Sequence, residues 1–144
     1  MRERPDWDEY FLNIAEAVSL RSHDAETQVG CVVVAENRHI VSTGYNGFPP
    51  GCADHDLPNS RPEKYPYMIH AEANAVANAE KPLRGATCYC LISPCNDCAK
   101  LLLAAGIARV VCRMAYWNSD WEKVQELLRM GGVEIRVLKE VEPE

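Results

Sequence analysis

The sequence lacks both a long apolar run and a cluster of basic residues. Its longest apolar stretch, residues 101–105, ends at Gly106, whereas a membrane-spanning helix needs about 20 consecutive apolar residues. Residues 1–6 are charged where a secretory signal would be apolar. Fifteen lysines and arginines stand against 21 aspartates and glutamates, and the net charge of −6 repels nucleic-acid polymers. We therefore expect that the chain is not a membrane protein. We also expect that it does not bind a nucleic-acid polymer.

The sequence also lacks the pattern of a disulfide framework, because its seven cysteines are an odd number. A chain of 144 residues buries enough surface to fold without disulfides. We expect a cytoplasmic location with reduced thiols, and one domain over residues 1–144. Four cysteines lie in apolar segments, where a free cysteine packs like a small hydrophobic residue: Cys31, Cys88, Cys90 and Cys112.

The hydrophobic pattern predicts alternating helices and strands. An N-cap pair, Asp6 and Glu9, precedes apolar residues at helical spacing up to about residue 20. Two β-branched runs, residues 30–35 and 39–45, predict a hairpin, and the proline-rich residues 46–66 predict a long functional loop. Beyond the loop, the pattern predicts helices over residues 70–80, 95–105 and 120–130 and strands over 86–92, 108–113 and 133–138.

The order of these elements predicts the fold class. From the hairpin onward it is β-β-α-β-α-β-α-β, and strands separated by helices need crossover connections. Crossovers favour parallel pairing and place helices on both faces of the sheet. We predict an α/β fold, a three-layer α/β/α sandwich with a five-stranded mixed sheet. Residues 140–144 are expected to form a frayed acidic tail.

Two short motifs combine metal-binding residues with a carboxylate. They are HAE at residues 70–72 and PCNDC at residues 94–98, each at the start of a predicted helix. Cys95 and Cys98 are three residues apart, so they project from one helix face and can hold one ion. His70 precedes them by one strand and can approach from the neighbouring helix start. One histidine and two cysteines leave a fourth tetrahedral position open, as in catalytic zinc sites.

Glu72 completes this pattern only under one geometric condition. It lies about 200° around a regular helix from His70, so both can serve one pocket only if the helix begins between them. A carboxylate beside zinc-bound water can take a proton and return protons to a ring nitrogen and a departing amine. The combined pattern is the established signature of zinc nucleobase deaminases. The alternative is a non-catalytic zinc module, with Cys88 or Cys90 as the fourth ligand.

The sequence further resembles the zinc-dependent cytidine and deoxycytidylate deaminase family, and within it the deoxycytidylate branch. The resemblance covers about residues 20–137. It rests on GYNGFPPGC at residues 44–52, KYPY at 64–67, HAEANA at 70–75 and PCNDCAK at 94–100. It implies a cytidine deaminase-like fold and hydrolysis of dCMP to dUMP and ammonia. The dUMP would then be used for thymidylate synthesis. His70, Cys95 and Cys98 would hold Zn²⁺, hydroxide on the zinc would attack C4, and Glu72 would shuttle protons.

The same resemblance assigns substrate-binding and regulatory residues. Asn46 would bind the sugar and orient the base, with Ala71 and Tyr116 also at the substrate. A regulatory site would bind dCTP with Mg²⁺ as activator and dTTP as inhibitor, in a homohexamer. The residues assigned to that regulatory site are Gly44, Asn46, Gly47 and Asp54.

Several alternatives stay open at this stage. MAYWNSD at residues 114–120 departs from the family's Asp-Lys-Tyr ahead of Ser-Asp, so dCTP, alone or beside dCMP, is an alternative substrate. A second zinc could use Cys52, His55 and His23. Candidate phosphate partners are Arg21, Lys64 and Arg113. The aromatic residues that could stack on a base or simply pack are Tyr65, Tyr67, Tyr116 and Trp117.

Overall fold

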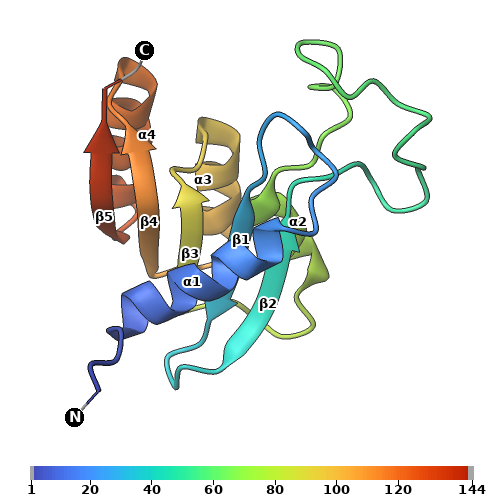
Figure 1. Cartoon of the computed structure of the whole chain (residues 1–144). Helices are drawn as coiled ribbons and strands as arrows, with labels where there is room; N and C mark the ends of the chain where they lie inside the picture. The colour runs from blue at the N-terminus through green and yellow to red at the C-terminus, as the bar shows by residue number, and fades with distance from the viewer. Residues whose placement is uncertain (1, 143–144) are drawn as a thin grey trace.

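The computed structural model describes residues 2–142. It contains a five-stranded mixed sheet with helices on both faces (Figure 1), which confirms the predicted three-layer α/β/α sandwich. The strands are β1 (Gly30–Val34), β2 (Ile40–Tyr45), β3 (Thr87–Ile92), β4 (Arg109–Tyr116) and β5 (Glu134–Val141). The helices are α1 (Trp7–Ser19), α2 (Ala71–Asn78), α3 (Asn96–Ala104) and α4 (Ser119–Met130).

The strand order, β2-β1-β3-β4-β5, determines which loops meet. β1 is antiparallel to both β2 and β3, whereas β3, β4 and β5 are parallel. Gly30 at the start of β1 therefore pairs with Tyr45 at the end of β2, and Cys31 pairs with Cys90 near the end of β3. The segment before β1, the loop after β2 and the loop after β3 consequently lie at one edge of the sheet.

The two faces of the sheet carry separate apolar cores. On one face α1 packs through Phe11 and Leu12 against Val32, Tyr89 and Val111. The opposite face is covered by α2, α3 and α4 (Figure 1). The four strand cysteines lie in this second core with no exposed surface, as expected: Cys31, Cys88, Cys90 and Cys112.

Gly44 on β2 lets α2 approach the sheet closely. A Cβ atom at this position would collide with the backbone oxygen of Ala71 and the backbone nitrogen of Ala75. The first turn of α2 therefore rests directly on β2. This contact fixes the position of the helix start at the edge where the three segments meet.

The last two strands are longer than the sequence pattern predicts. β4 continues past residue 113 to Tyr116, and β5 continues past residue 138 to Val141. The prediction of a frayed tail was wrong for Glu140 and Val141, which pair with Ala115 and Tyr116; residues 143–144 lie outside the described part of the chain. The pattern missed this extension because most side chains at the end of β5 are exposed and show no clear apolar alternation.

The predicted loop begins at Asn46 and continues as far as His70, the residue that precedes α2. Gly47 and Ile69 form an isolated antiparallel bridge that closes its base. In Figure 1 the loop extends away from the sheet on the side of β1 and β2. None of the helices between residues 2 and 142 is long and apolar enough to cross a membrane.

Candidate active site

His70, Cys95 and Cys98 converge at the edge of the sheet where the loops meet. The Nδ1 atom of His70 lies 3.4 Å from the Sγ atom of Cys95 and 3.4 Å from that of Cys98. A nitrogen and a sulfur ligand on one tetrahedral zinc would be separated by about 3.5 Å, given bond lengths of about 2.0 and 2.3 Å. One nitrogen and two sulfur donors at this spacing therefore fit Zn²⁺.

The ligand group holds three residues rather than four. In the chain between residues 2 and 142, no fourth histidine, cysteine or carboxylate atom lies within 4.8 Å of all three ligand atoms. Cys88 and Cys90, the suggested fourth ligands of a structural site, instead group with Cys31. The donor set thus leaves one tetrahedral position without a protein ligand, as catalytic zinc sites do.

Two helix starts hold these ligands. His70 is the N-cap of α2 and Cys95 is the N-cap of α3, where its Sγ accepts a hydrogen bond from the backbone N–H of Cys98 at 3.4 Å. Hydrogen bonds from the Cys98 thiol and from His70 lower the pKa of Cys95 to about 4. These hydrogen bonds therefore favour the thiolate form of Cys95, which is the form that binds a metal.

Glu72 satisfies the geometric condition set by the sequence. α2 begins at Ala71, and His70 before it has an extended backbone (φ −67°, ψ 155°). The side chains of His70 and Glu72 therefore line the same cavity. Burial, followed by the nearby Cys88, raises the pKa of Glu72 to about 7. Glu72 as a whole is only 5% exposed, so its carboxyl group lies in a site from which bulk water is largely excluded.

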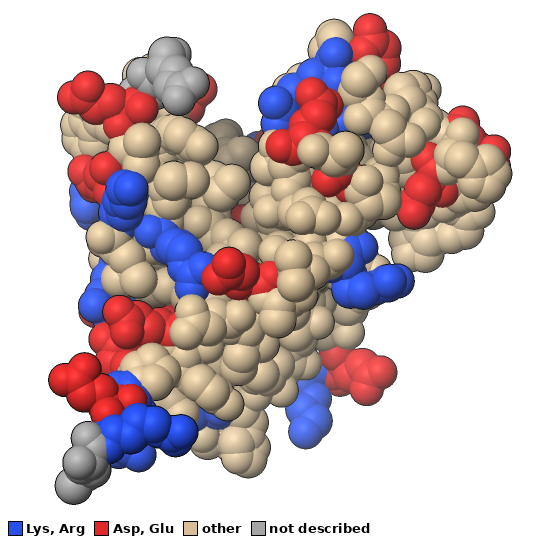
Figure 2. Space-filling view, in the orientation of Figure 1, with Lys and Arg blue, Asp and Glu red and all other residues tan. Residues whose placement is uncertain are grey.

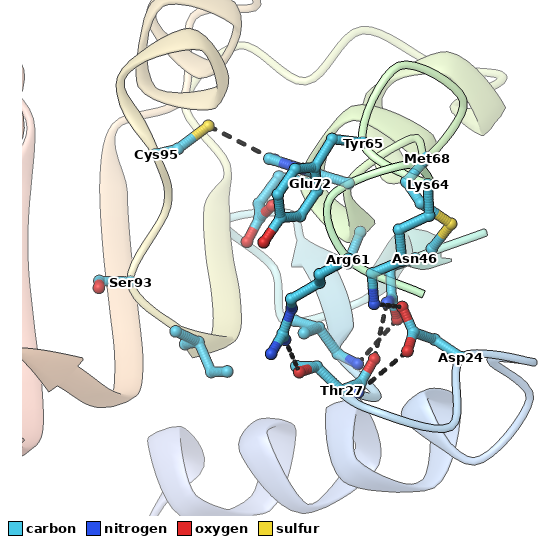
Figure 3. A pocket seen from close by; sticks show the side chains of 14 residues that line it. Asp24, Thr27, Asn46, Arg61, Lys64, Tyr65, Met68, Glu72, Ser93 and Cys95 are labelled. Carbon is cyan, nitrogen blue, oxygen red and sulfur yellow. Dashed lines mark hydrogen bonds and ion pairs between the residues drawn. The ribbon is translucent and has the colours of Figure 1, made fainter. Parts of the chain in front are cut away.

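The cavity beside these residues has a volume of about 320 Å³. Its walls come from the segment before β1, the long loop, the start of α2 and the turn after β3 (Figure 3). It therefore brings residues from four parts of the chain around Glu72. The lining residues that carry polar side chains are Asp24, Thr27, Asn46, Arg61, Lys64, Tyr65, His70, Glu72, Ser93 and Cys95.

Asn46 lies in this cavity with its amide held by backbone atoms. Its Oδ1 accepts a hydrogen bond from the N–H of Val29 at 2.9 Å, and its Nδ2 donates to the carbonyl oxygen of Thr27 at 2.8 Å. One N–H and one lone pair remain, because an amide offers two donors and two acceptor sites. Ala71 also lines the cavity. Tyr116 lies apart from it, in a neighbouring hollow that shares only Ile92, Ser93 and Cys95 with the first.

The residues assigned to regulation differ in their exposure to solvent. Gly44 and Gly47 are buried at the base of the loop, whereas the side chain of Asp54 is 64% exposed. The proposed second zinc ligands are not brought together into a three-residue group in the described chain. His23 packs against Phe48 at 4.4 Å between ring centroids.

The candidate phosphate partners differ in their surroundings. Lys64 lines the cavity but is buried against carboxylates, and Arg113 pairs with Glu16 of α1 on the other face of the sheet. Arg21 is exposed and lines neither hollow. Of the candidate stacking residues, Tyr65 lines the cavity, whereas Tyr67 and Trp117 are partly exposed outside it.

Four polar residues of the cavity were not predicted from the sequence, namely Asp24, Thr27, Arg61 and Ser93. They lie in connecting segments without hydrophobic periodicity, so no spacing marked them. The only sequence signal was the length of the proline-rich loop that contains Arg61. A loop of this length indicates a functional role but does not show which of its residues carry it.

The chain also matches a known protein family. The family model for the cytidine and deoxycytidylate deaminase zinc-binding region matches residues 5–114. The chain is 43% identical over 141 residues to deoxycytidylate deaminase from Homo sapiens, a match that covers 91% of this chain and 79% of that relative.

Solved structures of a dCMP deaminase also match this chain. The dCMP deaminase of cyanophage S-TIM5 in apo form matches with a TM-score of 0.74 and 30% identity, over 94% of this chain and 99% of that one. Its structure in complex with dCMP and dUMP matches with a TM-score of 0.73 and 28% identity, over the same shares of the two chains. With its His/Cys group, its buried glutamate and these matches, the chain belongs to the zinc-binding cytidine and deoxycytidylate deaminase family.

Proposed function

We propose that this deaminase converts dCMP to dUMP and ammonia. The observation that carries the proposal is the placement of the His70, Cys95 and Cys98 group and the buried Glu72 on one cavity, with no fourth protein ligand in the described chain. The named activity of the human relative and the dCMP and dUMP bound to the phage enzyme support the choice of substrate.

The residues around the cavity suit a hydrolytic deamination. When bound by His70, Cys95 and Cys98, Zn²⁺ would lower the pKa of a water molecule, so that this water can lose a proton near neutral pH and attack C4 as hydroxide. Glu72 accepts one proton of that water and donates it to N3 of the ring. The proton of the new C4 hydroxyl passes by the same carboxylate to the amino nitrogen, the C4–N bond breaks, and ammonia leaves.

Asn46 would position the substrate, and the buried surroundings of the cavity would exclude water from it. The Asn46 amide is fixed by Val29 and Thr27, so its remaining N–H is held in place for the sugar or the base. Holding C4 close to the attacking water replaces a bimolecular encounter by an intramolecular step. In this proposal Ala71 packs beside the ring, while Tyr116 borders the neighbouring hollow.

A polynucleotide substrate is disfavoured by the distribution of charge. Figure 2 shows acidic and basic side chains mixed over the visible face, without a continuous basic path. Single-stranded nucleic acid binding typically needs a positively charged groove that follows the backbone. The net charge of −6 points the same way, toward a small nucleotide as substrate.

Regulation by dCTP with Mg²⁺ and by dTTP, in a homohexamer, forms a second part of the proposal that rests on the family resemblance. Of the four residues assigned to it, Asp54 offers an exposed carboxylate. Gly44 and Gly47 would act by shaping the loop, because both are buried.

A substrate panel tests the proposal. Ammonia release is measured with dCMP, dCTP, deoxycytidine and CMP, each with and without added dCTP or dTTP and Mg²⁺. We expect the highest kcat/KM for dCMP. A higher value for dCTP would replace dCMP by the triphosphate as substrate, and no release from any of the four would refute the activity. Unchanged rates with both effectors would remove the regulatory part.

A further inference from the structure

Two cationic side chains line the cavity, and one of them is already neutralised. The Nζ atom of Lys64 lies 2.6 Å from Oδ2 of Asp24 and 3.1 Å from Oε1 of Glu26. The Lys64 and Asp24 side chains are only 4% and 3% exposed. The Lys64 charge is therefore committed to this buried cluster and is not free for a ligand anion.

Arg61 has a different environment. Its Nη2 donates a hydrogen bond to Oγ1 of Thr27 at 2.5 Å, which is a neutral partner. Within residues 2–142, no carboxylate oxygen lies within 4.0 Å of its guanidinium nitrogens. A guanidinium has five N–H donors, so most of those of Arg61 have no protein partner in the described chain.

The backbone of Arg61 is nevertheless anchored. Its N–H donates a hydrogen bond to Oε1 of Glu26 at 3.1 Å, and the same oxygen forms the ion pair with Nζ of Lys64. Asp24 in turn accepts backbone N–H groups of Glu26 and Thr27 at 2.8 and 3.1 Å. The buried Asp24–Lys64 pair thus holds the two segments that carry Arg61 and its Thr27 partner, and the side chain extends toward the cavity (Figure 3).

We propose that Arg61 binds the 5′-phosphate of the substrate and makes this deaminase select nucleotides over nucleosides. The inference rests on the proposed function and names a specificity-determining residue for it. A guanidinium can bind a phosphate through two parallel N–H···O bonds, and it keeps its charge at any working pH. One cation without a carboxylate partner suits a monophosphate dianion better than a triphosphate, which carries more negative charge.

The test compares dCMP with deoxycytidine, because the two differ only in the phosphate. kcat and KM are measured for both in the wild-type chain, Arg61→Gln and Arg61→Lys. We expect the ratio of the two kcat/KM values, dCMP over deoxycytidine, to fall about ten- to hundredfold in Arg61→Gln, mainly through a higher KM for dCMP. Arg61→Lys retains part of the ratio, since the charge remains but the paired donors are lost.

Three further substitutions make the result specific. Arg84→Gln removes an exposed arginine just before β3, at the end of that strand remote from Ser93, and should keep the wild-type ratio. Arg21→Gln removes another candidate phosphate partner, and Lys123→Gln removes a cation that lines the neighbouring hollow. If either of these lowers the ratio while Arg61→Gln keeps it, the assignment to Arg61 is overturned.

The outcomes also separate this inference from the proposed function. A wild-type chain that prefers dCMP, together with an Arg61→Gln variant that keeps this preference, overturns the inference alone. A wild-type chain that deaminates neither compound overturns both. A variant that loses activity on dCMP and deoxycytidine in the same proportion shows a structural role for Arg61 and also overturns the inference.

Discussion

The side chains of His70 and Glu72 face one cavity although they are only two residues apart, because α2 begins between them. Inside a regular helix the same two side chains would point in nearly opposite directions. The helix start therefore places a metal ligand and a proton carrier together, and their roles can be separated by substitution.

Replacing Glu72 should strongly reduce turnover without removing the metal. Glu72→Gln keeps the shape of the side chain but cannot accept and return a proton, so we expect kcat to fall by about 10² to 10⁴. Ammonia release and zinc content are measured on the same preparation. Glu80→Gln, at an exposed residue beyond α2, is the control and should match the wild type. Activity retained by Glu72→Gln would refute the proton-transfer role.

Zinc should be bound by two sulfurs and one nitrogen. X-ray absorption of the zinc-loaded chain is expected to fit two sulfur ligands with additional nitrogen or oxygen, and Cys98→Ser should lower zinc content. Cys112→Ser, in the strand core, serves as the control and should keep one zinc per chain. A spectrum that requires three sulfur ligands would instead indicate the non-catalytic zinc module.

Removing one partner of the Asp24–Lys64 pair should destabilise the fold. Lys64→Met leaves Asp24, 3% exposed, as an unpaired buried charge, which typically costs about 3–5 kcal/mol. Urea unfolding measures the loss, and Lys81→Met at an exposed position should change stability little. The double variant with Asp24→Leu should recover part of the loss. A Lys64→Met chain as stable as the wild type would contradict the buried-pair interpretation.

Asp8 should make stability depend on pH in the acid range. The hydrogen bond from Arg109, then those from Arg136 and Tyr89, lower the pKa of Asp8 despite its burial. Because the folded-state pKa is below the unfolded value of about 3.9, the stabilisation is present above that pH and is lost as pH falls toward the folded-state value.

The Asp8 effect can be measured with an uncharged variant. Asp8→Asn should lose about 2–3 kcal/mol of unfolding free energy at pH 7, and its difference from the wild type should shrink as the pH is lowered from 5 to 3. Asp120→Asn at an exposed position is the control. A difference that stayed constant over this range would show that the carboxylate charge is not responsible.

The sequence predicted the parts of this protein that depend on local pattern. Alternating helices and strands gave the sandwich, and motifs at two helix starts gave His70, Glu72, Cys95 and Cys98. It did not predict that Lys64 pairs with Asp24, 40 residues away, or that Arg61 lines the cavity. Those contacts depend on how an irregular loop folds over another segment, which hydrophobic periodicity does not encode.

Finally, the seven free cysteines fall into chemically distinct groups. Hydrogen bonding lowers the pKa of Cys95 to about 4, whereas hydrogen bonding to Cys112 and burial raise that of Cys90 to about 12. An alkylating reagent at neutral pH should thus label Cys52, which is exposed, gain Cys95 once a chelator strips the metal, and reach the strand thiols only after denaturation. Mass shifts of the intact chain would then report metal loading and unfolding as separate steps.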